Sequence, residues 1–331
     1  MSQAECNASP LFPEDCLLMA PLSGYTDLPF RRACRRHGCY YAFTPLIEAG
    51  AVVFGNRHTE ALLLRGEEEP WLGIQMLGAC PDRIHSAVRL LSGRSYDVID
   101  LNMGCPVKKV TKRGAGVALC YTPSLAVECV HAIREATDLP LTAKIRVLSG
   151  GNPGRTVALA TRLESAGVQA LTIHGRTWEQ IYRGPVASTV IRAVAEAVNI
   201  PVIANGGVVD AGSAAELRLA SGCSRLMVAR GAIGNPWVFQ QAASHPAGDG
   251  IPSHMEICDE VERHVHGMVE LYGERTGMRN ARKIILAYLV GRGYRRQRRK
   301  HAVDLSTLAE FVAFMRGVRN EGPLDLSCFG S

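Results

Sequence analysis

The sequence lacks several features that would assign it to a special class of protein. No apolar run approaches the about 20 residues that a membrane-spanning helix needs, so no membrane contact is expected. The segment from Met1 to Pro13 has neither a basic flank nor an apolar stretch, which predicts no signal peptide. The 11 cysteines include no Cys-x-x-Cys pair, which argues against a zinc site and a disulfide framework. A cytoplasmic protein with reduced thiols and no metal is expected.

What is present is an ordinary globular composition over 331 residues, with 47% hydrophobic and 21% charged residues. A chain of this length can bury about three quarters of its unfolded surface, so its core needs no covalent staples. It can form one large domain, or a barrel with a smaller partner.

The basic residues are concentrated in one place. Between Arg279 and Lys300 there are nine Lys or Arg and no acid, and the rest of the chain has 28 basic against 31 acidic residues. The net charge of +6 therefore comes from this single stretch. A solvated helix face is one interpretation, and a surface that binds a polyanion is the other.

Short apolar runs alternate with helical patterns along most of the chain. The eight expected strands are Leu17–Ala20, Tyr40–Thr44, Leu72–Met76, Val98–Leu101, Leu141–Ile145, Ala170–Ile173, Pro201–Ala204 and Arg225–Val228. The clearest helical patterns between them are Leu125–Ala136, Thr156–Ser165 and Ala187–Ala197. This alternation predicts an α/β fold, a (β/α)₈ TIM barrel. An open doubly wound sheet is disfavoured because Pro21-Leu22-Ser23-Gly24, and no Gly-x-Gly-x-x-Gly, follows the first strand.

The pattern changes after Phe239. A connector, His245–Pro252, leads into helical segments Glu256–Tyr272, Arg279–Val290 and Leu305–Val318, with no further strand. The sequence thus predicts a barrel over residues 1–245 and a small all-helical domain over 252–325 that carries the basic stretch.

Polar residues follow seven of the eight expected strands. Because active sites of TIM barrels lie at the C-terminal ends of the strands, these residues should converge on one rim. They are Pro21-Leu22-Ser23, Gln75, Asn102 with Cys105, Lys144 with Arg146, His174 with Arg176, Asn205-Gly206-Gly207, and Arg230-Gly231.

Glycines occur in both loops where TIM barrels commonly bind phosphate, those after the last two strands. Gly206, Gly207 and Gly231 let the backbone approach an anion closely. Tight turns are the alternative explanation. Glycines in both loops favour a phosphorylated ligand.

Lys144 and His174 end adjacent strands. A lysine in a barrel mouth is costly to bury without an anionic partner, and a reduced flavin carries negative charge on its pyrimidine side. Gln75 could hydrogen-bond the same edge of the flavin ring. An internal ion pair between Lys144 and Asp100 is the alternative.

Cys105 stands in Asn102-Met103-Gly104-Cys105-Pro106, and four basic residues, Lys108, Lys109, Lys112 and Arg113, follow it. A cysteine can act as a nucleophile, with His174 as its base, or as a proton donor. The spacing leaves both roles open.

These residues resemble those of the tRNA-dihydrouridine synthases, FMN enzymes with a TIM barrel and a C-terminal helical domain. The resemblance runs from Leu17 to Phe239 and fades beyond Pro252. It is carried by Met19–Asp27, Pro29-Phe30-Arg31, Asp100–Pro106, Lys109-Val110, Gly114-Ala115-Gly116, Lys144-Ile145-Arg146, His174–Thr177, Asn205-Gly206-Gly207 and Gly234–Trp237.

The resemblance implies that reduced FMN delivers hydride to uracil C6, that Cys105 protonates C5, and that NADPH supplies the electrons. The FMN-contacting positions would be Pro21, Leu22, Ser23, Gln75, Lys144, His174, Asn205, Gly206, Gly207, Ala229 and Arg230. Contacts with the tRNA would come from Asn102, Lys109, Arg146 and Arg176 of the barrel. The charge of the basic stretch adds Arg295, Arg296 and Arg299 of the helical domain. A monomer is expected.

The sequence departs from the family pattern at a few positions. Ala229 stands where glycine is common, Trp178 replaces a basic residue, and Gly184–Ala187 lacks an Asp-Trp pair. These changes leave the modified uridine undefined. Two rival functions are a small-molecule FMN dehydrogenase of the dihydroorotate or dihydropyrimidine type and an RNA-binding protein whose barrel has lost catalysis. The dehydrogenase would not need the basic helical domain, which argues against it. The RNA-binding protein without catalysis would not need Cys105, Lys144 and His174, which argues against that function.

Overall fold

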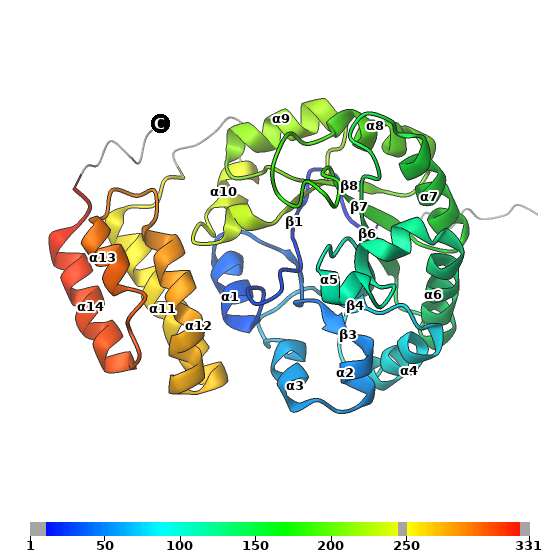
Figure 1. Ribbon diagram of the computed structural model, residues 1–331. Coiled ribbons are helices and arrows are strands. Elements are labelled where there is room, and N and C mark those ends of the chain that lie inside the picture. The colour runs from blue at the N-terminus through cyan, green and yellow to red at the C-terminus, as the bar shows by residue number, and fades with distance from the viewer. Residues whose placement is uncertain (1–10, 244–249, 325–331) are drawn as a thin grey trace, which may run out of the picture.

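The computed structural model describes residues 11–243 and 250–324. The ends of the two predicted domains and part of the connector His245–Pro252 therefore lie outside the described residues, as does most of Met1–Pro13. Within the described ranges, a parallel β-barrel is followed by a group of C-terminal helices (Figure 1).

Among the described residues, nine strands form one parallel sheet, and pairing of β2 with β4 closes it into a barrel. The strands are β1 Leu17–Met19, β2 Tyr41–Phe43, β3 Ile47–Glu48, β4 Leu72–Leu77, β5 Val98–Met103, β6 Leu141–Arg146, β7 Ala170–His174, β8 Val202–Asn205 and β9 Leu226–Val228. Eight of them make the ring. The short β3 extends the pairing along the C-terminal half of β4. The predicted TIM barrel is confirmed, and β3 is the strand that the sequence did not reveal.

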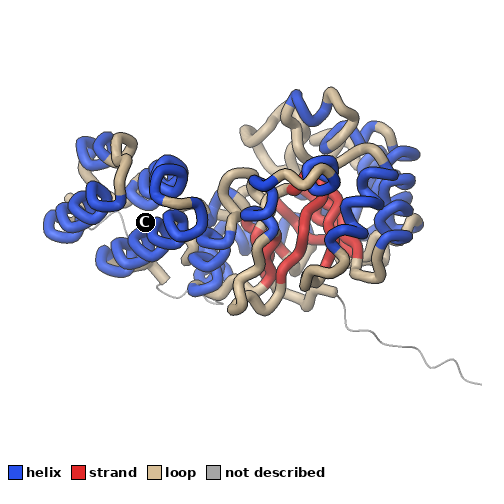
Figure 2. The backbone as a smooth tube through the Cα atoms, turned by 90° about the horizontal axis from the view of Figure 1, so that it is seen from below, coloured by secondary structure: helices blue, strands red, loops and turns tan. Residues whose placement is uncertain are grey.

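Most helices of the barrel region cover its outside, while the strands lie inside (Figure 2). The helices of this region are α1 Leu28–Arg36, α2 Ala49–Val53, α3 Arg57–Leu63, α4 Pro81–Leu91, α5 Lys108–Thr111, η1 Gly116–Tyr121, α6 Pro123–Ala136, α7 Gly154–Ser165, α8 Ser188–Ala197, α9 Ala211–Ser221, η2 Arg230–Ala232 and α10 Val238–Ala243. The C-terminal helices are α11 His254–Tyr272, α12 Glu274–Leu289, α13 Arg296–His301 and α14 Leu308–Glu321. The prediction missed α13, because a run of arginines has no apolar periodicity to mark a helix.

Alternation of side chains along the strands divides the interior of the barrel into layers. An apolar layer at the N-terminal end contains Leu18, Phe43, Val98, Ala170, Ile203 and Met227. Phe12 and Trp71 close this end, with their ring centroids 5.5 Å apart. Two residues further along β5, β7 and β8, the inward positions are the polar residues Asp100, Thr172 and Asn205, because side chains alternate between the two faces of a strand. The packed floor therefore supports a polar mouth at the opposite end.

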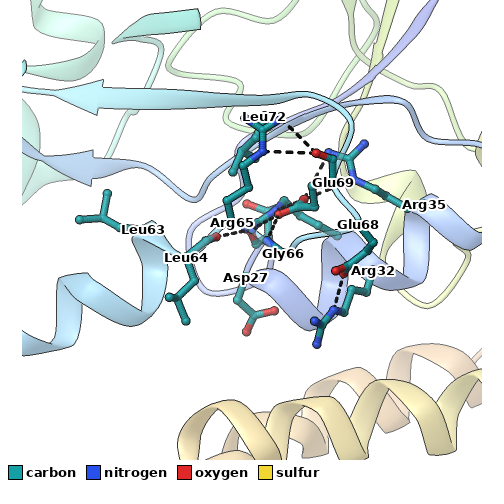
Figure 3. A network of polar contacts seen from close by, with 12 residues as sticks. Asp27, Arg32, Arg35, Leu63, Leu64, Arg65, Gly66, Glu68, Glu69 and Leu72 are labelled. Atoms are coloured by element: carbon teal, nitrogen blue, oxygen red, sulfur yellow. Dashed lines mark hydrogen bonds and ion pairs between the residues drawn. The ribbon is translucent and has the colours of Figure 1, made fainter. Parts of the chain in front are cut away.

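A buried ion-pair network holds α1 against the loop that precedes β4. Arg31 is fully buried, and its guanidinium lies 2.7 Å from the Glu69 carboxylate, which also accepts from Arg35. Figure 3 shows Arg32 and Arg35 of α1 directed toward Glu68 and Glu69. Arg31 also donates to the Thr26 carbonyl at 3.0 Å, so the network fixes the loop between β1 and α1.

The C-terminal helices pack directly on the barrel. Residues of α11 and α12 belong to the same hydrophobic cluster as the barrel and its helices. Buried Glu260 of α11 accepts from Arg36 at 3.1 Å, and Tyr272 donates to Asp27 at 3.0 Å. Lys283 of α12 donates to the Gly24 carbonyl and lies 4.1 Å from the centre of the Tyr25 ring. The helical part therefore supports the loop that follows β1.

Candidate active site

The register of the sheet brings the predicted rim residues to the C-terminal mouth of the barrel. Lys144 on β6 is paired with Asn102 on β5. Two residues further along β6, Arg146 is paired with His174 on β7. His174 is in turn paired with Asn205 on β8. Residues far apart in the sequence therefore lie at two successive levels of one polar mouth.

Lys144 reaches across the mouth toward β8. Its ammonium donates to Asn205 Oδ1 at 2.7 Å, and the Asn205 amide donates to the Met227 carbonyl at 2.8 Å. The expected alternative, an ion pair with Asp100, does not occur between these described side chains. Burial, reinforced by the charge of Arg146, lowers the pKa of Lys144 to about 7. The charge of Asp100 opposes this shift from a distance, but among the described residues no anionic group forms an ion pair with the Lys144 ammonium.

A chain of hydrogen bonds links the barrel interior to the Cys105 turn. Asp100 accepts from Thr142 at 2.6 Å and from the Gln75 amide at 2.7 Å. Gln75 Oε1 accepts from Asn102 at 2.6 Å, and Asn102 Oδ1 accepts from the backbone N–H of Cys105 at 3.0 Å. Burial raises the pKa of Asp100 to about 6, against the opposing effects of Thr142, Gln75 and Lys144.

These hydrogen bonds give Gln75 and Asn102 contacts that the sequence did not predict. Both amides are engaged inside the protein, Gln75 with Asp100 and Asn102 with the turn that carries Cys105. Asn102 follows the pattern of an Asx turn, in which a side-chain oxygen binds backbone N–H groups two and three residues ahead. These internal hydrogen bonds do not test the contacts with flavin and uracil that the sequence predicts for Gln75 and Asn102, which stay predictions.

Cys105 itself lies partly exposed at the end of β5. The carbonyl before it, that of Gly104, accepts from Arg146 Nε at 2.7 Å. The same guanidinium donates to the carbonyls of Arg176 and Thr177 at 3.2 Å and of Ile181 at 3.1 Å. Arg146 is only 3% exposed, so it ties the Cys105 turn to the loop after β7. The sequence predicts substrate contact for Arg146 and does not reveal this positioning role.

His174 is surrounded by positive charge. Burial is the main cause that lowers its pKa, to about 2, and Lys144, Arg146, Arg176 and Arg230 each lower it further. The imidazole is therefore neutral, and no hydrogen bond joins it to Cys105 among the described side chains. A neutral histidine with so low a pKa is a poor base, which disfavours the nucleophile role for Cys105.

The loops after β8 and β9 form the other side of the mouth. Gly206 and Gly207 have φ values of +139° and +80°, which side chains of L-residues rarely tolerate. Gly231 has a different role, because a Cβ there would lie 2.1 Å from the Val208 carbonyl oxygen. It allows the two loops to pack against each other. The predicted phosphate site thus rests on Gly206 and Gly207 more than on Gly231.

Two arginines flank these glycines. A Cβ on Gly206 would lie 3.5 Å from an Arg176 nitrogen, and Arg176 donates to the Gly184 carbonyl at 2.9 Å. Arg230 follows Ala229 and stacks over the Tyr182 ring at 4.3 Å. Burial and the neighbouring charge of Arg230 lower the pKa of Arg176. The mouth is therefore cationic from Lys144 to Arg230.

The remaining predicted residues lie on the loop after β1, on α5 and on α13. Pro21, Leu22 and Ser23 form the loop after β1, where the Leu22 N–H donates to Thr26 Oγ1 at 3.0 Å. Lys109 is exposed on α5. Arg295 and Arg296 are exposed at the start of α13, and Arg299 lies partly buried within it. In Figure 1, α11 and α12 lie between α13 and the barrel.

The basic stretch divides into structural and free charges. Four members have contacts within the protein: Arg282 with the Leu305 carbonyl, Lys283 with Gly24, Arg292 with the Gly234 carbonyl and Arg298 with Glu321. Arg295, Arg296 and Lys300 are exposed. The polyanion-binding interpretation therefore depends on fewer residues than the sequence suggests.

Two further observations concern the described residues as a whole. They contain no cluster of three or more His, Cys, Asp or Glu side chains that could hold a metal ion. None of the helices among them is long and apolar enough to cross a membrane.

Comparison with known proteins gives consistent results. Residues 18–320 match the family model described as dihydrouridine synthase. The chain is 35% identical to tRNA-dihydrouridine synthase B of Serratia marcescens over 83% of each chain. It is 36% identical to a probable tRNA-dihydrouridine synthase of Rhodobacter capsulatus, covering 81% of this chain and 84% of that protein. A histamine dehydrogenase structure from Rhizobium sp. 4-9 is similar in fold alone, with a TM-score of 0.50, 12% identity, and coverage of 74% of this chain and 47% of that one.

Proposed function

Because this chain belongs to the dihydrouridine synthase family and is a tRNA-dihydrouridine synthase, we propose that Cys105 is its catalytic acid and that the cationic mouth holds FMN. The observation that carries this proposal is the partly exposed Cys105 thiol, held on a fixed turn beside a lysine that lacks an anionic partner. The match over residues 18–320 includes the C-terminal helices, which favours tRNA over a small pyrimidine as substrate.

The mouth suits FMN, the cofactor that the family uses. Lys144, Arg176 and Arg230 supply positive charge, and the carboxylate beneath them, Asp100, is buried and already hydrogen-bonded. Gly206 and Gly207 have positive φ values, and glycines in such a turn let backbone N–H groups approach an anion closely. The FMN contacts that we propose are Pro21, Leu22, Ser23, Gln75, Lys144, His174, Asn205, Gly206, Gly207, Ala229 and Arg230.

The chemistry that FMN supplies when bound is hydride transfer to C6 of uracil, with NADPH as the proposed source of electrons. Cys105 Sγ releases a proton to C5, so that the C5=C6 double bond gains one hydride and one proton. Asn102 and Arg146 hold the Cys105 turn, through its backbone N–H and through the preceding carbonyl. Because its pKa is lowered, His174 stays neutral and adds no positive charge to the mouth.

The first test concerns the cofactor. We expect the purified full-length protein to be yellow and to release FMN on denaturation. After reconstitution with FMN and addition of NADPH, it should form dihydrouridine on unmodified tRNA transcripts, detected by nucleoside mass spectrometry. Protein that is colourless and does not take up added FMN would contradict the proposal.

The substrate must place a uracil in the barrel mouth. Extruding a base from folded RNA costs a few kcal/mol, which contacts with the phosphate backbone can offset. We propose Lys109 and Arg176 near the mouth, and Arg295, Arg296 and Arg299 of the helical part, as such contacts. Phosphate contacts position an RNA without reading its sequence, so these residues contribute affinity rather than choice of base.

A double substitution tests the helical contacts. Replacing Arg295 and Arg296 by Ala should weaken tRNA binding and lower the slope of log affinity against log salt by about two, since each phosphate contact contributes close to one. Binding would be measured by fluorescence anisotropy at several salt concentrations. Arg89→Ala, an exposed arginine on α4, is the control. An unchanged salt slope in the double variant would mean that Arg295 and Arg296 do not contact the tRNA, and the basic stretch would then be interpreted as a solvated helix face.

We also propose that the protein acts as a cytoplasmic monomer. All nine cysteines among the described residues are free, which suits a reducing compartment. The barrel and the C-terminal helices share one hydrophobic cluster within a single chain, so the tRNA-binding helices are held in place without a partner subunit.

A further inference from the structure

A pocket beside the Cys105 loop shares one residue, Lys109, with the tRNA contacts proposed above, and its other lining residues have no role there. It has a volume of about 720 Å³ and lies where β3 and β4 end, between α2, α4 and α5. Figure 1 shows α5 over the barrel mouth, with α2 and α4 on the adjoining rim. None of the residues proposed to contact FMN lines it.

The polar side of this pocket is cationic. Arg83 of α4, together with Lys109 and Arg113 around α5, faces a single carboxylate, that of Glu48. Glu48 already accepts from the Ala51 N–H at 2.8 Å and caps α2. None of the three basic residues forms an ion pair with another residue in the described part of the chain. Three unpaired cations around one cavity favour a ligand with several negative charges.

The other side of the pocket is apolar and made of small residues. Ala49, Ala79 and Ala115 line it together with Leu77 and Val110. Small side chains leave room for a flat ring, and ligand pockets typically combine such apolar walls with a few charged groups. A base and ribose can pack on this wall while phosphates face Arg83, Lys109 and Arg113.

The pocket adjoins the reacting centre. Lys109 follows Cys105 by four residues, and the Cys105 carbonyl accepts from the Val117 N–H at 3.0 Å, which closes the loop around α5. Leu77 follows Gln75 by two residues on β4. A ligand held in the pocket by one end can therefore extend its other end into the barrel mouth.

We propose that this pocket binds the adenosine-phosphate half of NADPH, with its 2′-phosphate and pyrophosphate on Arg83, Lys109 and Arg113. This inference rests on NADPH as the electron donor in the proposed function. A concave pocket with an apolar wall suits one nucleotide unit better than a tRNA backbone, whose phosphates lie on the outside of a helix. NADH lacks the 2′-phosphate and would leave part of this charge unpaired, so the pocket selects NADPH.

Calorimetry on the full-length FMN-loaded protein tests the pocket without any catalysis. We expect 2′,5′-ADP to bind and to compete with NADPH, and 5′-AMP to bind more weakly. Arg83→Ala should weaken 2′,5′-ADP binding by about ten- to a hundredfold, the effect of losing one charge-assisted contact. Arg89→Ala, on the same helix but outside the pocket, should leave it unchanged. Absence of 2′,5′-ADP binding, or equal loss in both variants, would overturn the proposal.

Separate half-reactions distinguish the donor from the tRNA. In Arg83→Ala, anaerobic bleaching of the flavin should require about ten- to a hundredfold more NADPH, with a much smaller change for NADH. Enzyme reduced beforehand with dithionite should convert tRNA at the normal rate. If Arg83→Ala instead weakened tRNA binding and left the NADPH dependence intact, the pocket would be a tRNA-binding site and the proposal would be wrong. Failure of the Cys105 proposal would appear only in the tRNA half-reaction, so the two outcomes are separable.

Discussion

Replacing Cys105 by Ala should reduce dihydrouridine formation by about 10²- to 10⁴-fold, the usual contribution of a positioned general acid. The FMN content should not change, because the thiol belongs to the loop after β5 and the proposed cofactor contacts lie on other loops and strands. The measurement is single-turnover conversion of unmodified tRNA by the reduced enzyme, with the flavin content determined on the same sample. Cys105→Ser should retain part of the activity, because a hydroxyl can occupy the same position but gives up its proton less readily.

The control for this variant is Cys16→Ala. Cys16 is also a free, partly exposed cysteine, but it precedes β1 at the opposite end of the barrel. Its loss should leave turnover close to that of the unchanged protein. Equal activity of the Cys105→Ala and Cys16→Ala proteins would remove Cys105 from the reaction. Loss of FMN from the Cys105→Ala protein would instead indicate a structural role for the turn.

Replacing Lys144 by Met should have two effects of opposite sign. It should lower the affinity for FMN by about ten- to a hundredfold, since hydrogen bonds to a charged group contribute about 1.5–3 kcal/mol. It should also stabilise the cofactor-free protein, because Met fills a similar volume without a charge to desolvate. FMN affinity would be measured by quenching of flavin fluorescence, and stability by chemical denaturation of the cofactor-free form.

The pH dependence gives the sign of the second effect. The pKa of Lys144 is about 7 in the folded protein and about 10.4 in an unfolded chain. Between these values the unfolded chain binds more protons, so the free energy of unfolding rises with pH. The stability advantage of Lys144→Met should therefore be largest at or below pH 7 and should shrink toward pH 10. A variant that is less stable than the unchanged protein at pH 7 would mean that Lys144 is already paired without FMN.

The strands of the barrel and most of its mouth are predictable from the sequence. All eight expected strands are present within a few residues, because each is an apolar run bounded by turn residues. The rim residues follow from the same pattern, since the last polar residues of parallel strands meet at one end of a barrel. The helices α11, α12 and α14 were also expected, although α12 begins five residues before the predicted Arg279.

The contacts across the mouth depend on the tertiary structure. Spacing along a strand gives the direction of a side chain, but its lateral partner depends on barrel closure and on the course of the loops. For this reason Lys144 with Asn205, and the chain from Asp100 through Gln75 to Asn102, could not be deduced from sequence spacing. The same holds for Arg146, whose four carbonyl partners come from two loops.

The sequence by itself determined the fold class, the family and the set of residues at the mouth. The tertiary structure decided which of these residues hold one another and which keep a charge without a partner. It also divided the basic stretch, because Arg282, Lys283, Arg292 and Arg298 are engaged by neighbours distant in sequence or on other elements. The physical reason is that periodicity encodes burial and direction, whereas pairing of charges depends on the distances that only the closed barrel and its packed helices set.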